Sequence, residues 1–341
     1  MTESSRFSSA HVTLKEPPQH SYTLITMTSF PKPRAPGPRS AVGDSLDIEH
    51  RNAVLRATSN VLSTSHCILT MAQLMDGLPL CDIARCSRGA RIGVGHPLNN
   101  HTELCDGVME RTEAWIAGLD LSSLQLERTL LENFNNTETG SDEFNLRLVE
   151  VVAASIHQLS VILYNKQDKC HVEAEIRSVT SWQRARRPSD TWTVHLAPWP
   201  TLFLNHEYLN YDQYPDGLAD AAAYWAEDRI FGGVVLFERG ESDTECKSIY
   251  FHSGRRKETV RAWKLPEHHL RALLVFLTSD SIGKGEDSPC PIPISCERTN
   301  IHRVDSWDAM AARHIYRDPW ERKVPLEKDV NSIRYNDFDY P

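Results

Sequence analysis

The segment that most constrains the fold of this chain is "FNLRLVEVVAASIHQLSVILYN", residues 144–165. Its apolar residues recur every three or four positions, which predicts one long helix. The stripe that they form is wide and consists of Leu148, Val151, Val152, Ser155, Ile156, Leu159, Ile162 and Leu163. Because a helix with so wide a stripe has to be covered by other elements on much of its surface, we expect it near the centre of a globular domain.

Other elements are expected on both sides of this helix. Residues 45–75 show the periodicity of one or two amphipathic helices, and residues 102–120 and 123–134 predict two more. Further along, "GGVVLFERG" and "CKSIYFH" predict an antiparallel hairpin, and "TVRAWKL" a third strand. We therefore predict an α+β fold, with a helix-rich N-terminal half packed on a small sheet contributed mainly by the C-terminal half. The alternative is an α/β fold in which "ARIGVG", residues 90–95, joins a parallel sheet.

The domain organisation follows from a change in composition near residue 43. Residues 1–43 are rich in Ser, Pro and basic residues, which bury too little apolar surface to fold, so we predict a disordered tail. Residues 44–335 are predicted to form a single domain. Its parts are a helical part (44–165), a sheet-containing part (166–280) and a C-terminal loop and helix (281–335).

Charge and targeting signals limit the function classes. The formal net charge of −9 argues against a dedicated nucleic-acid binder, although a local basic patch is compatible with it. No run of about 18 apolar residues is present, and the first residues lack the apolar core of a secretory signal. We therefore expect a cytoplasmic protein without a membrane partner.

The cysteines and histidines predict no metal site. The eight cysteines include no Cys-x-x-Cys pair, which favours free thiols. Cys170 and His171 are adjacent, so their side chains diverge, and His96 and His101 flank a loop. Phosphate-binding and nucleotide-binding motifs are missing as well. We expect neither a metal nor another cofactor.

The stretch "YPDGLADAAAYWAEDRIFGGVVLFERG", residues 214–240, predicts a helix that passes directly into a buried strand. Asp216 is a candidate N-cap, and Asp220, Tyr224 and Glu227 share one face of the helix. Either this face is solvated, or it meets a cleft at the end of the strand. In a cleft, burial would raise the pKa of the Glu227 carboxyl toward use as a general base.

Two further groups of side chains have both a structural and a functional interpretation. Tyr250 and His252 alternate onto one face of a strand, where His252 is either a proton carrier or an ordinary hydrogen-bonded residue. Two arginine clusters either contact phosphates or are solvated loop charges. Their members are Arg184, Arg186 and Arg187 in "WQRARRP", and Arg255 and Arg256 in "SGRRK".

Four segments together resemble a widespread group of filamentous-fungal proteins. They are "EVVAASIHQLSVILYN", "YDQYPDGLADAAAYWAEDRIFGGVVLFERGESDTECK", "IYFH" and "IYRDPWER". The resemblance covers roughly residues 45–335 and implies a fungal intracellular protein, with no activity attached.

The order "YWAE", apolar strand, then Tyr and His is in addition similar to the late motif of cyclodipeptide synthases. These enzymes join two amino acids taken from aminoacyl-tRNAs, and fungi contain an arginine-using branch. The resemblance implies that Tyr224 and Glu227 orient the aminoacyl group and that Tyr250 and His252 complete the pocket. It also implies Asp220 and the arginine clusters as contacts to substrate and tRNA. The family's nucleophile loop corresponds to "GVGHPLNN", which supplies Asn99 and no serine.

Two hypotheses follow. The first is a fungal enzyme of specialised metabolism, an aminoacyltransferase that forms an arginine-containing cyclic dipeptide from aminoacyl-tRNA. The second is a non-catalytic α+β binding or regulatory module. The synthase requires "ARIGVG" and "GGVVLF" as parallel neighbours in one sheet, whereas an antiparallel meander of "GGVVLF" with "CKSIYFH" favours the binding module.

Overall fold

The structure is a computed structural model that describes residues 37–90, 92–184, 199–280 and 290–318. The chain divides into two units, residues 1–30 and 31–341, and the described residues belong to the second. Its α-helices are α1 (Val42–Ser45), α2 (Ile48–Leu62), α3 (Ser65–Asp76), α4 (Cys81–Arg85), α5 (Val108–Ala117), α6 (Arg128–Asn135), α7 (Asp142–Tyr164), α8 (Glu173–Thr180), α9 (Leu218–Phe231), α10 (Glu267–Thr278) and α11 (Ser306–Ala311). Short 3-10 helices are η1 (Pro97–Asn100), η2 (Leu121–Ser123) and η3 (Tyr211–Gln213).

The strands form two antiparallel sheets. The smaller sheet pairs β1 (Arg39–Ala41) with β2 (Gln125–Glu127). The larger has the order β6-β5-β4-β3-β7. Its strands are β3 (Val234–Glu238), β4 (Ile249–His252), β5 (Ala262–Lys264), β6 (Arg303–Val304) and β7 (Ile315–Tyr316).

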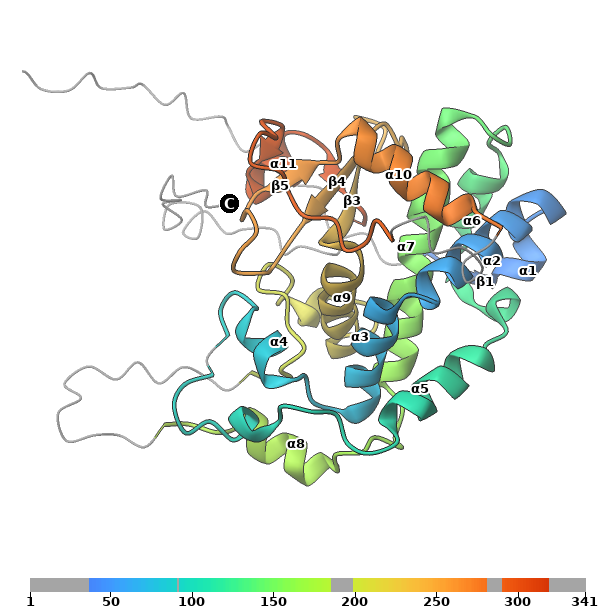
Figure 1. The fold of residues 1–341 in the computed structure, drawn as a ribbon. Coiled ribbons are helices and arrows are strands. Elements are labelled where there is room, and N and C mark those ends of the chain that lie inside the picture. Colours follow the sequence, from blue (N-terminus) through green and yellow to red (C-terminus); the bar gives the residue numbers. More distant parts are fainter. Residues whose placement is uncertain (1–36, 91, 185–198, 281–289, 319–341) are drawn as a thin grey trace, which may run out of the picture. The chain divides into compact units, whose positions relative to one another are not determined.

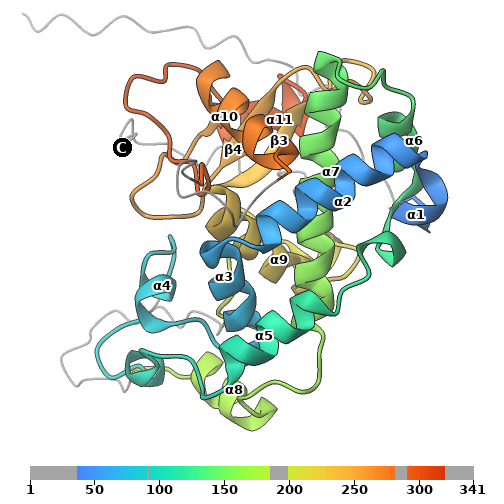
Figure 2. The same ribbon diagram turned by 45° about the vertical axis from the view of Figure 1, so that its right-hand side comes forward.

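Helix α7 is the central helix, as its wide apolar stripe predicted. The Ser141 hydroxyl caps it by accepting a hydrogen bond from the Phe144 N–H at 3.0 Å. Helices α2, α3, α6 and α9 all contact it, and α9 runs alongside it (Figures 1 and 2). By length and composition alone α7 could cross a membrane, but its most apolar part is mostly buried inside the fold. A buried core helix passes the same test, so this helix alone is weak support for a membrane span.

The predicted hairpin and third strand are confirmed. β3 pairs antiparallel with β4 in the register Val234↔His252 and Leu236↔Tyr250, and β5 pairs with β4. Side chains of β3 alternate between the main core and a second apolar cluster, so both faces of the strand are buried. This is why its sequence is a continuous run of apolar residues. The described residues of 90–95 belong to no strand. The α+β prediction is therefore confirmed, and the parallel-sheet alternative is wrong.

Several boundaries differ from those expected, because strand pairing overrides local signals. Residues 39–43 fall in the expected tail, yet they form β1 and the start of α1, while residues 1–36 lie outside the described residues. β2 occupies the beginning of the helix expected over 123–134, so that helix starts at Arg128. The expected C-terminal helix ends at Ala311, because Ile315 and Tyr316 add to the sheet beside β3.

Candidate functional site

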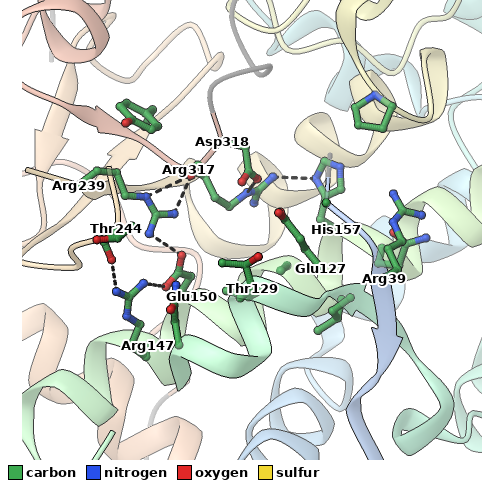
Figure 3. Close-up of a pocket in the computed structure, with 18 of the residues that line it drawn as sticks. Arg39, Glu127, Thr129, Arg147, Glu150, His157, Arg239, Thr244, Arg317 and Asp318 are labelled. Carbon is green, nitrogen blue, oxygen red and sulfur yellow. Dashed lines mark hydrogen bonds and ion pairs between the residues drawn. The ribbon is translucent and has the colours of Figure 1, made fainter. Parts of the chain in front are cut away.

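A cavity of about 260 Å³ lies between α7, α9 and β7, and the segments around β1, β2 and the start of α6 complete its wall (Figure 3). The residues that line it are Gly37, Arg39, Leu126, Glu127, Thr129, Leu130, Asn133, Arg147, Glu150, Ala154, His157, Gln158, Pro215, Asp220, Tyr224, Arg239, Asp243, Thr244, Tyr316, Arg317 and Asp318. Charged side chains of both signs dominate this wall, so the cavity suits a polar ligand.

The predicted face of α9 lies against this cavity and not in water. Asp220, Tyr224 and Glu227 are 5%, 2% and 0% exposed, and the first two line the cavity while Glu227 lies behind them. The helix begins one residue later than expected, with Gly217 at the N-cap. Asp216 is therefore not the cap; its carboxylate pairs with Arg39 at 2.6 Å.

His157 on α7 connects the members of this face. Its Nδ1 lies 2.6 Å from Glu227 Oε1, and its Nε2 lies 3.0 Å from Asp220 Oδ1. The imidazole also packs against the Tyr224 ring, with centroids 4.5 Å apart. Arg317, directly after β7, donates from Nη1 to Glu227 Oε1 at 2.7 Å. Two helices and the end of the sheet are thus joined by one buried network.

The charges in this network set each other's protonation. Burial opposes a charge on the imidazole, but the hydrogen bonds to Asp220 and Glu227 outweigh burial and raise the pKa of His157 above its ordinary 6.5. Burial also opposes ionisation of Glu227, yet Arg317 and His157 hold the pKa of this carboxyl below its ordinary 4.5. The expectation that burial would raise the Glu227 pKa is therefore wrong. His157 has a carboxylate at each ring nitrogen, with Arg317 Nη2 also 3.2 Å from Nδ1, so its protonated form is favoured and it is a poor general base.

A second charged group forms the other part of the cavity wall. Glu150 lies between Arg147, whose Nη1 is 2.8 Å from Oε2, and Arg239, whose Nη1 is 2.6 Å from Oε1. Arg147 also donates to the Thr244 carbonyl, and Arg239 donates to the Arg317 carbonyl at 2.7 Å. Burial opposes ionisation of Glu150, but the two guanidiniums outweigh it and lower the pKa of this carboxyl. Two cations share one anion, so this triad carries a net positive charge.

Tyr250 and His252 lie behind Tyr224 and do not line the cavity. His252 is fully buried, with Nδ1 3.2 Å from the Tyr208 hydroxyl and Nε2 3.2 Å from the Val260 carbonyl. The Tyr208 ring stacks on Tyr224 with centroids 4.6 Å apart, and Tyr250 packs in the same apolar cluster. The four residues implied by the synthase resemblance therefore gather in one region, with only Tyr224 in contact with the cavity.

The residues predicted as further substrate contacts lie elsewhere. Asn99 is in η1, where its side chain accepts a hydrogen bond from Arg85 Nη2 at 2.7 Å. Arg184 is exposed and is not part of the cavity wall. Arg186 and Arg187 lie outside the described residues.

Arg255 and Arg256 connect the loop between β4 and β5 to neighbouring backbone. Arg255 Nη2 donates to the Gly232 carbonyl at 2.6 Å, and Arg256 Nε donates to the Ser87 carbonyl at 3.2 Å. Both guanidiniums are engaged in contacts within the chain, and neither lines the cavity.

Sequence reasoning missed His157, Arg317 and the triad of Arg147, Glu150 and Arg239. A signal was present for the α7 residues, because a helix whose surroundings are apolar rarely carries a buried Arg, Glu and His without partners. No local signal identifies Arg239 or Arg317, since only the pairing of β3 with β7 brings them to the cavity.

The expectation of no metal site stays a prediction, although the fold brings together side chains that could bind a cation. Two groups of side chains place three potential ligand atoms within reach of one cation: Asp76, Cys105 and His171, and His268, His269 and Glu297. Sequence spacing could not reveal the first group, because its members come from three separate parts of the chain.

Comparison with protein-family models, with curated proteins and with solved structures finds no match for this sequence.

Proposed function

We propose that this protein binds a small zwitterionic molecule of amino-acid or cyclic-dipeptide size in the cavity between α7 and α9. The observation that carries the proposal is the Arg147–Glu150–Arg239 triad. The three side chains carry one net positive charge, which the nearby Asp318 carboxyl reduces, and the buried Nε of Arg147 has no hydrogen-bond partner among the described residues. A buried guanidinium N–H without an acceptor is costly, and a ligand carboxylate would satisfy it.

The size and charge of the cavity support a ligand of this class. A volume of about 260 Å³ lies just below the range of roughly 300–1,000 Å³ that is common for drug-sized ligands. Glu127 contributes a carboxylate to the same wall, which suits an ammonium group, whereas Asp318 pairs with Arg317 and burial raises the pKa of its carboxyl. Figure 3 places Arg147 and Arg239 on one side of the cavity and Glu127 toward the side of His157. A ligand with a carboxylate and an amine would meet opposite charges at its two ends.

Isothermal titration calorimetry on the full chain tests this proposal. The titrants are free amino acids, including arginine, together with matched amines that lack the carboxylate. We expect binding of amino acids only, and a loss of about tenfold or more in affinity for Arg147→Gln, because a charge-assisted hydrogen bond contributes roughly 1.5–3 kcal/mol. Arg271→Gln, at an exposed arginine of α10, is the matched control. Equal affinity for amines without a carboxylate would contradict the proposal.

A more specific candidate is the formation of a cyclic dipeptide from aminoacyl-tRNA. Its support is the position of Tyr224 in the cavity wall with Glu227 directly behind it, as the synthase resemblance implies. The antiparallel arrangement of β3 and β4 instead favours the binding module. Among the described residues of the wall, Thr129 and Thr244 are the aliphatic hydroxyls that could act as a nucleophile.

Expression in a heterologous host, with mass spectrometry of the medium, separates the two candidates. A synthase would release a new cyclic dipeptide, and Tyr224→Phe and Glu227→Gln would abolish it. Tyr211→Phe, at an exposed tyrosine outside the cavity wall, would leave the product unchanged. If the folded protein releases no product but still binds amino acids, the synthase candidate is wrong and the binding proposal stands.

A further inference from the structure

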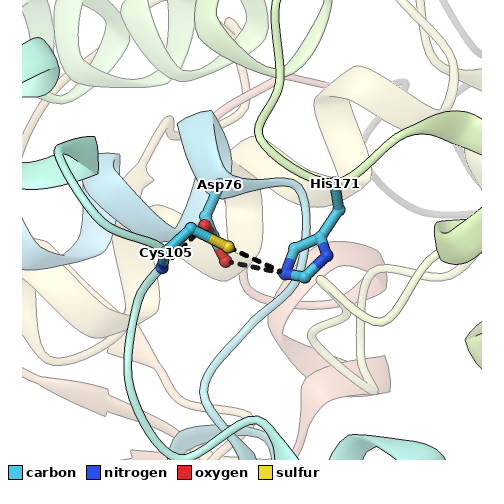
Figure 4. A group of neighbouring side chains, drawn as sticks. All are labelled: Asp76, Cys105 and His171. Carbon is cyan, nitrogen blue, oxygen red and sulfur yellow. Dashed lines mark hydrogen bonds and ion pairs between the residues drawn. The ribbon is translucent and has the colours of Figure 1, made fainter.

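Four side chains with metal-binding atoms meet away from the cavity, where the end of α3 approaches two loops. Figure 4 shows three of them, Asp76, Cys105 and His171. Asp76 is the last residue of α3, and His101 directly follows η1. Cys105 precedes α5, and His171 precedes α8. Backbone hydrogen bonds fix this arrangement, because the His171 N–H donates to the Asp76 carbonyl at 3.0 Å and the Cys81 N–H donates to the His101 carbonyl at 2.9 Å.

The ligand atoms of Asp76, Cys105 and His171 lie within 4.8 Å of one another, and His101 approaches this group through Asp76. Asp76 Oδ2 lies 2.9 Å from His101 Nε2 and 3.4 Å from His171 Nε2. Cys105 Sγ lies 3.4 Å from the same His171 nitrogen. Zinc bonds of about 2.0–2.3 Å at tetrahedral angles place neighbouring ligand atoms roughly 3.3–3.8 Å apart. A small movement of the side chains would therefore bring the four atoms to bonding distance from one ion at their centre.

Two of these atoms are buried and contact each other without the geometry of a hydrogen bond. Asp76 Oδ2 and His101 Nε2 are both buried and make no hydrogen bond, although they are 2.9 Å apart. The Asp76 side chain is fully buried, and its other oxygen already accepts a hydrogen bond from the Cys105 N–H at 3.2 Å. A buried carboxylate oxygen that has only such contacts is left with part of the cost of its desolvation. A cation that accepts a lone pair from each of the four atoms removes this cost.

The surroundings of His171 also resemble those of a metal-bound histidine. Its other ring nitrogen, Nδ1, lies 3.4 Å from Glu175 Oε2 on α8. A carboxylate at the far nitrogen orients the ring and leaves Nε2 free to bind a metal.

We propose that Asp76, His101, Cys105 and His171 bind one zinc ion. One sulfur, two nitrogens and one oxygen in tetrahedral arrangement form a ligand set that zinc accepts readily. All four positions are filled by the protein, which is the arrangement of a structural site and leaves no place for a reacting water. The ion would tie the end of α3 to the loop before α5 and to the segment that leads into α8.

Elemental analysis of the purified full chain, without an affinity tag and in a reducing buffer, tests this proposal. We expect one zinc per chain, and a loss in zinc affinity of more than about tenfold in Cys105→Ser and His171→Gln. Two matched controls should retain the metal: Cys170→Ser, a nearby thiol outside the four, and His268→Ala, in the exposed group with His269 and Glu297. Zinc that persists in Cys105→Ser, or a wild-type chain that neither contains zinc nor takes it up on titration, would overturn the proposal.

A cobalt-substituted wild-type chain keeps the test decisive if the variants do not fold. Tetrahedral cobalt with one thiolate ligand is expected to show strong visible bands and a thiolate-to-cobalt band in the near ultraviolet. A weak octahedral spectrum without the thiolate band would also overturn the proposal.

Discussion

Two buried groups in this protein contain the same kinds of side chain, a carboxylate next to histidine, and they differ in how completely their polar atoms are paired. In the α7–α9 network, both oxygens of Asp220 and of Glu227 accept hydrogen bonds. In the group at the end of α3, Asp76 Oδ2 has two imidazole nitrogens within 3.4 Å and no hydrogen bond. Full pairing marks a network that the protein completes by itself, whereas the incomplete hydrogen bonding of Asp76 is what the proposed zinc ion would explain.

The same criterion separates the parts of the cavity wall. His157 has a carboxylate at each ring nitrogen, and these two contacts hold its imidazole in place in the cavity wall. Arg147 is paired at Nη1 and Nη2 but retains an unpaired buried Nε. Ligand recognition in the cavity is therefore expected to depend on Arg147, and the His157 network is expected to hold the α9 face in position.

The largest expected effect is that of metal removal. A strong chelator should lower the stability of the chain by about 4 kcal/mol or more, because an ion present at a thousand times its dissociation constant contributes roughly this amount. Thermal unfolding with and without chelator measures the change. Added zinc should restore the unfolding midpoint. An identical midpoint with and without chelator would mean that the group around Asp76 needs no metal and does not differ in this respect from the His157 network.

The next effect is the loss of one charge from the paired network. Glu227→Gln leaves Arg317 and His157 buried without their shared anion, so we expect a loss of about 3–5 kcal/mol in the free energy of unfolding. Urea denaturation measures it, with the exposed Glu267→Gln as control. A loss as small as that of the control would mean that the network is not a structural unit.

A smaller effect is expected from pH. The pKa of His157 is raised in the folded state, so its contribution to stability is complete below pH 6.5 and is lost as pH rises through the folded value. The pKa of Glu227 is lowered, so its contribution is present above pH 4.5 and is lost as pH falls through the folded value. The network is therefore most stabilising between about pH 4.5 and 6.5. Urea unfolding at a series of pH values should show stability declining above this window in the wild type and a flatter profile in His157→Gln.

The smallest effect is expected at the exposed group. His268 and Glu297 have side chains 60% and 41% exposed, so His268→Ala should change neither zinc content nor unfolding midpoint beyond experimental error. A marked loss of either would show that exposure is a poor guide to which group binds metal.

The fold was largely predictable, because its main elements carry local signals. The periodicity of 144–165 predicted α7, and the two apolar runs predicted the hairpin of β3 and β4. Strand β1 has three residues and β7 has two, and both form by pairing with strands that are distant in the sequence. No local sequence pattern therefore predicts them. Propensity over so few residues is too weak to predict a strand.

The site was predictable only in part. One face of α9 was identified with Asp220, Tyr224 and Glu227, because helical spacing alone aligns these residues. Whether the face met water or a cavity depended on α7 and on Arg317, and hence on tertiary packing. The residues of the proposed zinc site were missed for the same reason, since the fold brings together residues as distant as Asp76 and His171.

Anomalous diffraction at the zinc absorption edge, from crystals grown without added metal, tests the central comparison most directly. We predict one peak bounded by Asp76 Oδ2, His101 Nε2, Cys105 Sγ and His171 Nε2, and no peak among His157, Asp220 and Glu227. A peak at the His157 network, or no peak together with a well-formed hydrogen bond between Asp76 and His101, would contradict the account.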